Sequence, residues 1–473
     1  MTARMSCAAT VLCALMLPAT IAQSQDSLAS RLARVDSLLR QQYPSAEPGA
    51  VVGIVVNGAL VFVGAHGMAD LEAQTPMGPE TPFNVMSVAK QFTAASVALL
   101  VERGALSLDD DVRRYIPELP DFGTPIRVRH LIHHTSGLRD IHALWTLAGS
   151  SPEAVRGREA HLAMLARQQH LNFVPGTEYS YTNSGYVLLA LIVERVSGQS
   201  FTEFTARELF GPLRMVHSAF AAPEPGTAAP APPSYRRDAN GRWIRLVSRD
   251  RRTGASDLVS TIPDLARWVV GLEQSRVGGQ GFARSLDSRG TLANGDTIEY
   301  AFGNIIDRHE GFREILHSGG LLGTRCKISR FPQRSLGIIY CGNGSPQYND
   351  VFYAIANILL LDAPLPKPRA ATVSRPTAAP PASSAPVGHE FVGRYVSAEL
   401  GQDLTVEVIA GEHVIRARQA ILARGVLSPA SATLRVDHAD LGTVTFQFVE
   451  RGQALIVSTE RVRRLTFVRS GDP

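Results

Sequence analysis

The spacing of apolar residues along the chain predicts a mixed α and β protein. Residues 27–42 place apolar side chains at helical intervals. Residues 51–63 form two apolar runs around Asn57-Gly58, which is a strong hairpin signal. We expect further helices in residues 83–104, 184–196, 261–272 and 350–361, and further strands within residues 302–341.

The last part of the chain has a different pattern. Residues 364–388 are rich in Pro, Ala and Ser, which predicts a semi-rigid linker. Beyond it, short β-like runs alternate with Gly, Ser and charged turns, so residues 389–473 are expected to form a small all-β barrel or sandwich. The strands expected there are residues 405–409, 414–417, 433–436, 443–449, 454–457 and 465–468.

The first 22 residues have the features of a secretory signal. Arg4 precedes an apolar run, and the small residues Thr20 and Ala22 stand before a plausible cleavage point. The run has about 11 residues, whereas a bilayer span needs about 20. We therefore predict a signal peptide over residues 1–22 and a periplasmic or secreted mature protein without a transmembrane segment. An uncleaved anchor helix is the alternative.

Composition and charge narrow the classes of function. The chain has 473 residues, of which 45% are hydrophobic and 19% charged, which is ordinary for a globular protein of two or three folded units. The net charge of +4 and the absence of like-charge runs give no sign of nucleic-acid binding. Lysine occurs only at Lys90, Lys327 and Lys367. Lysine, unlike arginine, loses its proton near neutral pH when its surroundings lower its pKa.

Ser87-Val-Ala-Lys90 has the spacing of a nucleophile and its base. At positions i and i+3 of a helix, both side chains lie on one face. A serine hydroxyl becomes a good nucleophile when a base removes its proton, and a lysine among apolar neighbours has a lowered pKa and can be that base. A surface helix is the plain alternative. The apolar stretch around Lys90 and the scarcity of lysine favour catalysis.

Tyr181-Thr182-Asn183 lies in a loop just before an expected helix. A tyrosine near cations can accept a proton as phenolate, and an asparagine can hold a substrate carbonyl and a lysine together. The alternative is a packed tyrosine followed by a helix cap.

His317-Ser318-Gly319-Gly320 stands at the entry to a strand. Two glycines allow a backbone to approach a substrate closely and leave N–H groups free to donate. The alternative is a strand end with a bulge.

Taken together in this order, the three segments resemble the motifs of the serine β-lactamase and penicillin-binding-protein superfamily. The resemblance is greatest to its class C branch and the related esterases and D-peptidases, and it extends over about residues 28–361. It implies an α/β (α+β) catalytic domain over residues 23–363, with an antiparallel sheet flanked by helices. It also implies an acyl-enzyme mechanism that needs no metal or organic cofactor.

The resemblance implies a role for each motif residue. Ser87 would be the acylated nucleophile, and Lys90 would exchange protons with it. Tyr181 would be the general base for acylation and would activate water for deacylation. Asn183 would orient the substrate amide, and the backbone N–H groups of Ser87 and Gly320 would form the oxyanion hole.

The third segment departs from the family pattern. β-Lactamases normally carry Lys-Thr-Gly there, and the lysine pairs with the substrate carboxylate. Here His317 takes that place, with Gly319 and Gly320 completing the substrate-binding strand. Histidine has an ordinary pKa of about 6.5 and is mostly neutral at pH 7. This weakens the case for penicillin hydrolysis and is similar to the pattern of D-aminopeptidases and β-lactamase-like esterases.

We therefore expect an exported serine hydrolase that acts on a small-molecule or peptide substrate, either a peptide containing a D-amino acid or a small ester. A true β-lactamase and a catalytically weak penicillin-binding or receptor-type protein are the alternatives. The oligomeric state is left open.

Cys326 and Cys341 remain after removal of the predicted signal. Residues 323–342 predict a hairpin whose turn lies at 332–335, which places residue 326 opposite 341. Opposed antiparallel residues are within disulfide distance. For an oxidising compartment, the sequence leaves two alternatives for this pair, a disulfide or two buried free thiols.

His130, His133 and His134 form a cluster that could suggest a metal site. They lack a nearby carboxylate or cysteine at the usual zinc spacing, so we expect no metal there.

Overall fold

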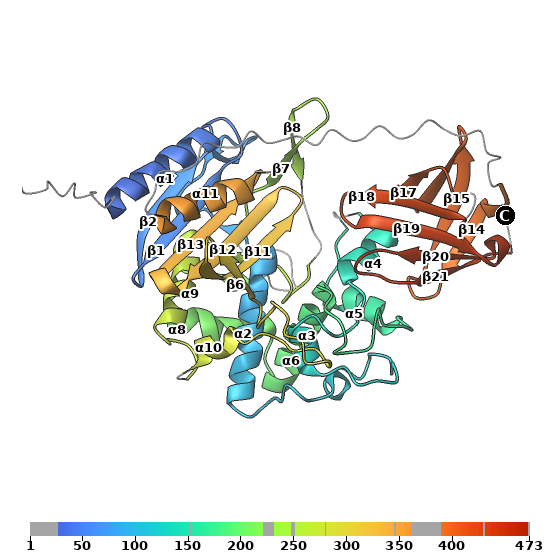
Figure 1. The fold of residues 1–473 in the computed structure, drawn as a ribbon, viewed down its shortest axis with the longest axis horizontal. Coiled ribbons are helices and arrows are strands. Elements are labelled where there is room, and N and C mark those ends of the chain that lie inside the picture. The colour runs from blue at the N-terminus through green and yellow to red at the C-terminus, as the bar shows by residue number, and fades with distance from the viewer. Residues whose placement is uncertain are drawn as a thin grey trace, which may run out of the picture.

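The computed structural model describes residues 27–151, 154–220, 231–246, 251–279, 281–344, 347–361, 389–428 and 431–471. Figure 1 shows a larger unit of sheet and helices and a smaller β unit formed by the C-terminal part of the chain. The predicted signal and linker lie outside the described residues. Within those residues, no helix has the length and apolar character needed to cross a membrane.

A six-stranded antiparallel sheet is the frame of the larger unit, with the order β10-β11-β12-β13-β1-β2. The N-terminal hairpin joins strands from the far end of the domain, because β1 pairs with β13 from Ala50 opposite Gly342 to Val56 opposite Leu336. The strands are β1 (Ala50–Val56), β2 (Ala59–His66), β10 (Ile305–His309), β11 (Phe312–Leu321), β12 (Thr324–Phe331) and β13 (Leu336–Gly342).

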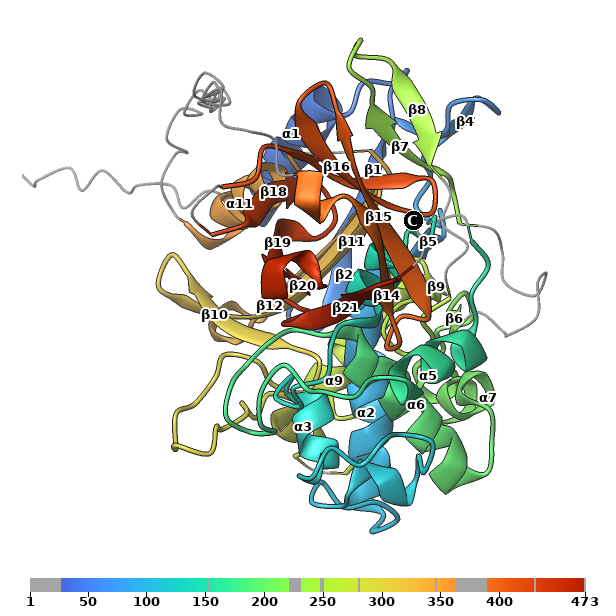
Figure 2. The ribbon, with the colours of Figure 1, turned by 90° about the vertical axis from the view of Figure 1, so that its right-hand side faces the viewer.

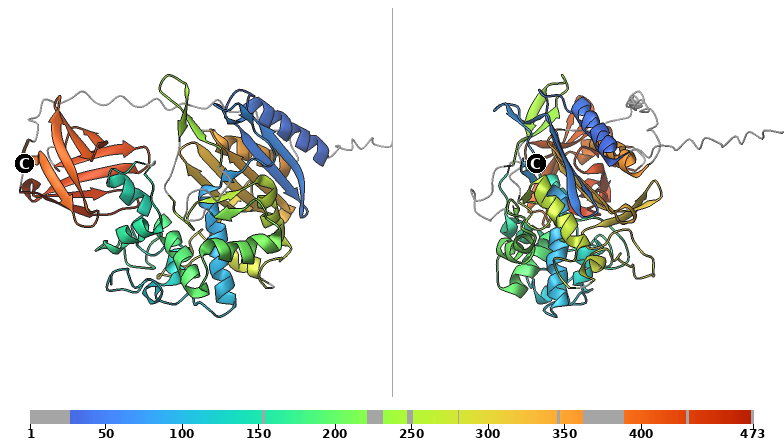
Figure 3. Two further views of the ribbon diagram at one scale, coloured as in Figure 1. Left: turned by 180° about the vertical axis from the view of Figure 1, so that it is seen from behind. Right: turned by 90° about the vertical axis from the view of Figure 1, so that its left-hand side faces the viewer.

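Helices cover both faces of this sheet. On one face, α1 (Leu28–Gln42) and α11 (Tyr348–Leu360) pack over Val52 and Ile54 of β1. On the other face, α9 (Ile262–Glu273) packs over Val51 and Val55. The alternation follows from the two-residue period of a strand and explains why β1 is apolar throughout. Figure 3 shows α1, in dark blue, along the side of the sheet away from the C-terminal unit.

The lower half of the larger unit in Figure 1 is helical and is built around α2. Every residue of α2 from Ala89 to Leu100 is buried, so this helix is the centre of the domain core and not an amphipathic surface helix. The surrounding helices are α3 (Val128–Ile132), α4 (Ile141–Leu147), α5 (Arg158–Ala166), α6 (Asn183–Ser197), α7 (Phe201–Thr205), α8 (Gly211–Leu213) and α10 (Phe282–Leu286), and α2 itself spans Ala89–Glu102.

Short strands connect the two halves. The residues just before α2 form β5, which pairs with β9, and this is where the prediction of a helix beginning at residue 83 is wrong. The short strands are β3 (Met68–Asp70), β4 (Thr75–Pro76), β5 (Phe83–Asn84), β6 (Ala219–Phe220), β7 (Ser234–Arg237), β8 (Trp243–Leu246) and β9 (Leu258–Ser260).

The C-terminal unit is an eight-stranded antiparallel sheet in the order β17-β16-β15-β14-β21-β20-β19-β18. Its end strands β17 and β18 contact each other, so the sheet curls toward a barrel around Tyr395, Phe446 and Phe467. This unit faces the viewer in Figure 2. The strands are β14 (Gly393–Ser397), β15 (Gln402–Ile409), β16 (Glu412–Ala417), β17 (Ala420–Gly425), β18 (Thr433–His438), β19 (Gly442–Val449), β20 (Ala454–Ser458) and β21 (Leu465–Arg469).

The predicted fold class is confirmed: the chain combines an antiparallel sheet flanked by helices with a β-rich C-terminal unit. The six strands expected in the C-terminal unit are all present. The sequence analysis missed β14 and β17, which carry a glycine and an arginine among their few residues and so lack a clear apolar alternation.

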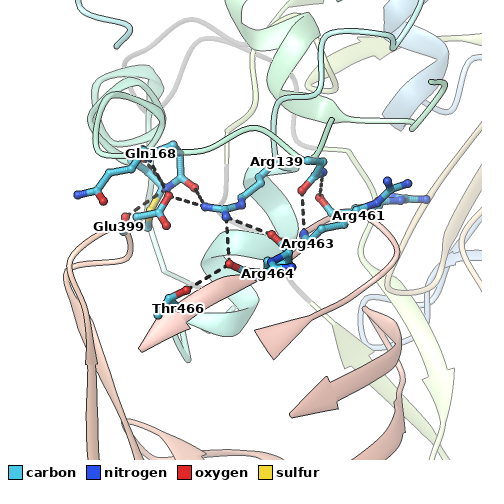
Figure 4. A network of polar contacts seen from close by, with 10 residues as sticks. Arg139, Gln168, Glu399, Arg461, Arg463, Arg464 and Thr466 are labelled. Carbon is cyan, nitrogen blue, oxygen red and sulfur yellow. Dashed lines mark hydrogen bonds and ion pairs between the residues drawn. The ribbon is translucent and has the colours of Figure 1, made fainter. Parts of the chain in front are cut away.

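A buried ion pair joins the two units (Figure 4). Arg139, just before α4, is 1% exposed and Glu399, just after β14, is 6% exposed. Arg139 also donates to the carbonyl oxygens of Arg463 and Arg464, at 3.1 and 3.4 Å. The backbone N–H of Gln169 donates to Glu399 at 2.8 Å. Each charge thus has its partners inside the interface, which is what a buried pair requires.

We expect Glu399→Gln to lower the free energy of unfolding by about 3–5 kcal/mol, because it leaves the Arg139 cation buried without its carboxylate. Chemical denaturation monitored by circular dichroism measures this. The matched control is Glu407→Gln, which breaks a half-exposed pair with Arg416 and should cost at most about 1 kcal/mol. Equal losses in the two variants would contradict the role given to the interface pair.

Candidate active site

Ser87 lies where a strand runs into the central helix. A 3-10 turn, Met86–Val88, follows β5 and continues directly into α2. Met86 has a φ of 52°, which is uncommon for a residue other than glycine, and its N–H is held by the side chain of Asn84 at 3.0 Å. The turn places the partly exposed Ser87 at the N-terminal end of α2, where the helix dipole favours developing negative charge.

Lys90 lies one helical turn further on and is completely buried. Its Nζ is 3.0 Å from Ser87 Oγ, 2.9 Å from Asn183 Oδ1 and 2.8 Å from the carbonyl oxygen of Ala255. The structure therefore brings the predicted nucleophile, base and amide together from α2 and the start of α6.

The surroundings of Lys90 favour its neutral form. Burial lowers the pKa of Lys90 well below its usual value, the charges of Arg252 and Arg461 lower it further, and Asp140 opposes them. A neutral amine has two hydrogens and one lone pair. Two of the three contacts of Nζ are to oxygens that only accept, so the lone pair is left to accept the proton of Ser87.

Tyr181 completes the group. Its ring centroid lies 4.9 Å from Lys90 Nζ, and its hydroxyl is near enough to Ser87 for that side chain to act on its pKa. Burial raises the pKa of Tyr181, while the hydrogen bond to Ser87 and the charge of Arg461 act in the opposite direction. Burial thus favours the neutral form of both groups, the phenol of Tyr181 and the amine of Lys90.

Asn183 is fixed by Asp140, a residue that the sequence analysis did not single out. Asp140 is completely buried, and its Oδ2 accepts the backbone N–H of Asn183 at 2.6 Å and its side-chain Nδ2 at 3.0 Å. Its Oδ1 caps α4 by accepting the N–H of Ala143. The amide oxygen of Asn183 is thereby turned toward Lys90. An aspartate directly before a helical run predicts a helix cap. No pattern in the sequence indicates that the same carboxylate also orients Asn183.

The third motif lies on β11, directly beside Ser87. Gly319 is the point of closest approach: a Cβ at this residue would collide with the carbonyl oxygen of Val85 and lie 2.7 Å from the nitrogen of Ser87. The partner of Gly319 on β12 is Cys326, which forms a disulfide with Cys341 on β13. The motif strand is therefore packed between the nucleophile turn and a cross-linked strand pair.

His317 is neutral and has hydrogen bonds at both ring nitrogens. Nδ1 donates to the carbonyl oxygen of Ser318 at 2.7 Å, which leaves Nε2 to accept from the hydroxyl of Tyr300 at 2.9 Å. Burial lowers the pKa of His317 to about 3, and the charge of Lys90 adds to this shift. His317 thus supplies no positive charge for a substrate carboxylate at neutral pH.

His134 packs in a cluster of aromatic rings beneath the site. Its ring centroid is 4.3 Å from that of Tyr181, 4.4 Å from Tyr300 and 5.1 Å from Tyr186. Its Nδ1 accepts the N–H of Thr182, and burial holds its pKa well below the usual value. This histidine supports the catalytic tyrosine by packing. Over the described part of the chain, no three His, Cys, Asp or Glu residues are grouped to hold a metal ion.

Arg461 approaches the same site from the C-terminal unit, in the loop between β20 and β21. Its guanidinium lies 5.2 Å from the ring centroid of Tyr181. Its carbonyl oxygen accepts the N–H of Asp140 at 3.1 Å and the side chain of Asn172 at 3.0 Å. The sequence analysis did not find Arg461, because one arginine among many in an all-β segment carries no local signal.

The chain is similar to several known proteins. The family model described as Beta-lactamase matches residues 35–363. A D-aminopeptidase of Brucella canis is 30% identical over 313 residues, which are 66% of this chain and 60% of the relative, so the chain spans less than two thirds of that protein.

Two solved structures share the fold. The octameric penicillin-binding protein homologue from Pyrococcus abyssi is 23% identical with a TM-score of 0.61, over 92% of this chain and 99% of that one. The D-amino acid amidase from Ochrobactrum anthropi SV3 is 19% identical with a TM-score of 0.59, over 69% and 98%. Since the family model covers most of the sequence and the predicted motifs meet in one site, the chain belongs to the β-lactamase family of serine hydrolases.

Proposed function

We propose that the protein is an exported hydrolase that cleaves an amide or ester bond through an acyl-enzyme on Ser87. The observation that carries the proposal is the 3.0 Å contact between Ser87 Oγ and the buried amine of Lys90, whose Nζ lies 4.9 Å from the ring centroid of Tyr181. The signal-like first 22 residues and the disulfide between Cys326 and Cys341 support export, because disulfides persist in oxidising compartments.

Acylation begins with the proton of Ser87. Lys90 accepts it as Oγ attacks the carbonyl carbon of the substrate, and the carbonyl oxygen becomes an oxyanion. We propose Tyr181 as the acid of this step and not as the general base that the resemblance implies, because its pKa is raised while that of Lys90 is lowered. When the tetrahedral intermediate collapses, the leaving amine or alcohol takes the phenol proton of Tyr181. The ammonium of Lys90 then returns a proton to Tyr181, which restores both groups. In deacylation, water gives a proton to this pair as its oxygen attacks the acyl carbon. The pair passes the proton to Ser87 Oγ when the acyl C–O bond breaks, which releases the acid and restores Ser87.

The backbone of β11 supports an oxyanion hole at Ser87. Gly319 packs against the turn that carries Ser87, which brings the strand that continues into Gly320 next to this turn. The N–H groups of Ser87 and Gly320 are the donors proposed for the oxyanion. One such donor is worth about 10²–10³ in rate.

The substrate class follows from the charge of the third motif. Since His317 is neutral and buried, the site lacks the lysine with which β-lactamases hold a carboxylate. We therefore propose an amide or small ester of a D-amino acid as substrate. The D-aminopeptidase relative and the D-amino acid amidase with the same fold support this choice.

Intact-mass spectrometry tests the nucleophile. We expect a fluorophosphonate probe to add one adduct to the wild type and none to Ser87→Ala. Ser96→Ala is the matched control, because Ser96 is buried on the same helix and bonds to the carbonyl of Phe92. A parallel incubation with a penicillin should give no turnover. A folded wild-type protein without a probe adduct, or rapid penicillin hydrolysis, would contradict the proposal.

Lys90→Arg should lower kcat/KM by about 10²–10⁴-fold, because arginine stays protonated and cannot act as the base. In the wild type, the lowered pKa of Lys90 should extend activity to lower pH than an ordinary lysine base would allow. Activity and thermal unfolding are measured together, with Lys327→Arg as the control for the same exchange at another buried lysine. Wild-type turnover by Lys90→Arg would remove Lys90 from the mechanism.

Gly319→Ala should lower kcat/KM by about 10²-fold, since the new Cβ must push β11 away from Ser87 and its N–H. Gly78→Ala is the control, because the nearest atom to its Cβ is 3.9 Å away. Steady-state kinetics with a chromogenic ester, on protein shown to be folded, gives the comparison. Equal rates for both variants would mean that the spacing between β11 and Ser87 has no part in catalysis.

A further inference from the structure

The loop that carries Arg461 has a shape fixed by its own hydrogen bonds. It connects β20 and β21 in the C-terminal unit. The hydroxyl of Thr459 accepts the backbone N–H groups of Arg461 and Val462, at 3.1 and 3.0 Å. The N–H of Thr459 donates to the carbonyl of Val462 at 2.6 Å. The loop is therefore a compact turn that presents Arg461 in one defined direction.

The catalytic domain holds this loop at its backbone. The carbonyl of Arg461 accepts the N–H of Asp140, the same residue whose carboxylate orients Asn183. Asn172 bonds to both sides of the loop: its Nδ2 donates to Arg461, and its Oδ1 accepts the N–H of Arg463 at 2.7 Å. Arg461 and Arg463 lie beside the interface ion pair of Arg139 and Glu399 in Figure 4. Docking of the C-terminal unit thus sets the position of Arg461 relative to the site.

Two cations flank the ring of Tyr181. Lys90 Nζ lies 4.9 Å from its centroid and the guanidinium of Arg461 lies 5.2 Å from it. One buried carboxylate, Asp140, acts on both cations. The other titratable or charged groups that act on Lys90 and Tyr181 or pack beside them are Arg252, His134, His317, Tyr179, Tyr186 and Tyr300, of which both histidines are neutral.

We infer that Arg461 is a positioning residue of the catalytic centre, by which the C-terminal domain supplies a positive charge that the reaction on Ser87 requires. The inference rests on the proposed function and deepens it. It makes the β domain part of the active site and not a separate module.

The physical reason lies in the competition for Asp140. Without Arg461, the buried carboxylate of Asp140 is left with His142 beside it and with Lys90, which it reaches through Asn183, and its charge favours the protonated amine of Lys90. With Arg461 present, the negative charge of Asp140 is balanced from the other side, and the positive charge of Arg461 disfavours a second cation at Lys90. The same charge stabilises a phenolate on Tyr181 during the proton relay.

The test compares Arg461→Gln with Arg464→Gln and Arg461→Lys in the full-length protein. Arg464 is in the same loop and its side chain is exposed. Arg464→Gln therefore also removes one positive charge from the loop, but at a position outside the site. In the pH profile of kcat/KM, we expect Arg461→Gln to shift the acid limb upward by about one pH unit. At pH values below that limb, kcat/KM of this variant should be about tenfold lower than that of the wild type. Arg461→Lys should recover most of this loss, and Arg464→Gln should match the wild type.

A pair of substrates separates this role from an anion subsite. We would use p-nitrophenyl acetate and p-nitrophenyl hydrogen succinate, of which only the second carries a carboxylate. The inference expects the same shifted limb for both esters. A loss confined to KM of the charged ester, with the limb unmoved, would overturn it, and so would a wild-type profile for Arg461→Gln.

A second measurement does not depend on turnover. The chain contains three lysines, so ¹³C-labelled lysine gives a spectrum in which the Lys90 signal is identified by its loss in Lys90→Arg. We expect the titration midpoint of Lys90 to rise in Arg461→Gln and to stay unchanged in Arg464→Gln. An unchanged midpoint in Arg461→Gln would overturn the inference. If the midpoint of Lys90 rises in Arg461→Gln while the wild-type protein shows no Ser87-dependent turnover, the result supports the effect of Arg461 on Lys90 and contradicts the proposed function.

Discussion

The buried amino group of Lys90 is the interaction on which the rest of the site depends. An uncompensated ammonium in a protein core is costly, so such a group either finds acceptors or loses its proton. Here its three neighbours are the nucleophile, an amide oxygen and a backbone carbonyl. Each of them comes from a different segment, and those segments must therefore keep their positions. The buried α2 helix provides the rigid base from which Lys90 reaches them.

The two units meet at the residues that hold Asn183 in place beside Lys90. Asp140 orients Asn183 with its carboxylate and binds the C-terminal loop with its backbone N–H. The residue before it, Arg139, forms the buried ion pair with Glu399. Two consecutive residues thus connect the catalytic amide to the β domain. A shift of the C-terminal unit would therefore move the residues that orient Asn183 beside Lys90.

Several features of the fold were predictable because they depend on neighbours in the sequence. The hairpin at Asn57-Gly58 and the helix capped by Thr261 follow from local turn and cap chemistry. The pairing of Cys326 with Cys341 follows from the position of a single turn. By contrast, Phe83 and Asn84 were predicted as helix and form β5, because pairing with the distant β9 overrides their local preference. The burial of α2 on all sides was equally invisible to its local pattern.

The sequence by itself determined which residue types are available for the chemistry: a serine and a lysine one helical turn apart, a Tyr-x-Asn loop, and a histidine with an ordinary pKa too low for a charged partner. These depend on spacing along one element. Only the tertiary structure decided that Asp140 holds Asn183, that Tyr300 binds His317, and that Arg461 stands over Tyr181. Charges and hydrogen bonds act through space, and their strength depends on burial, so neither follows from the order of residues along the chain.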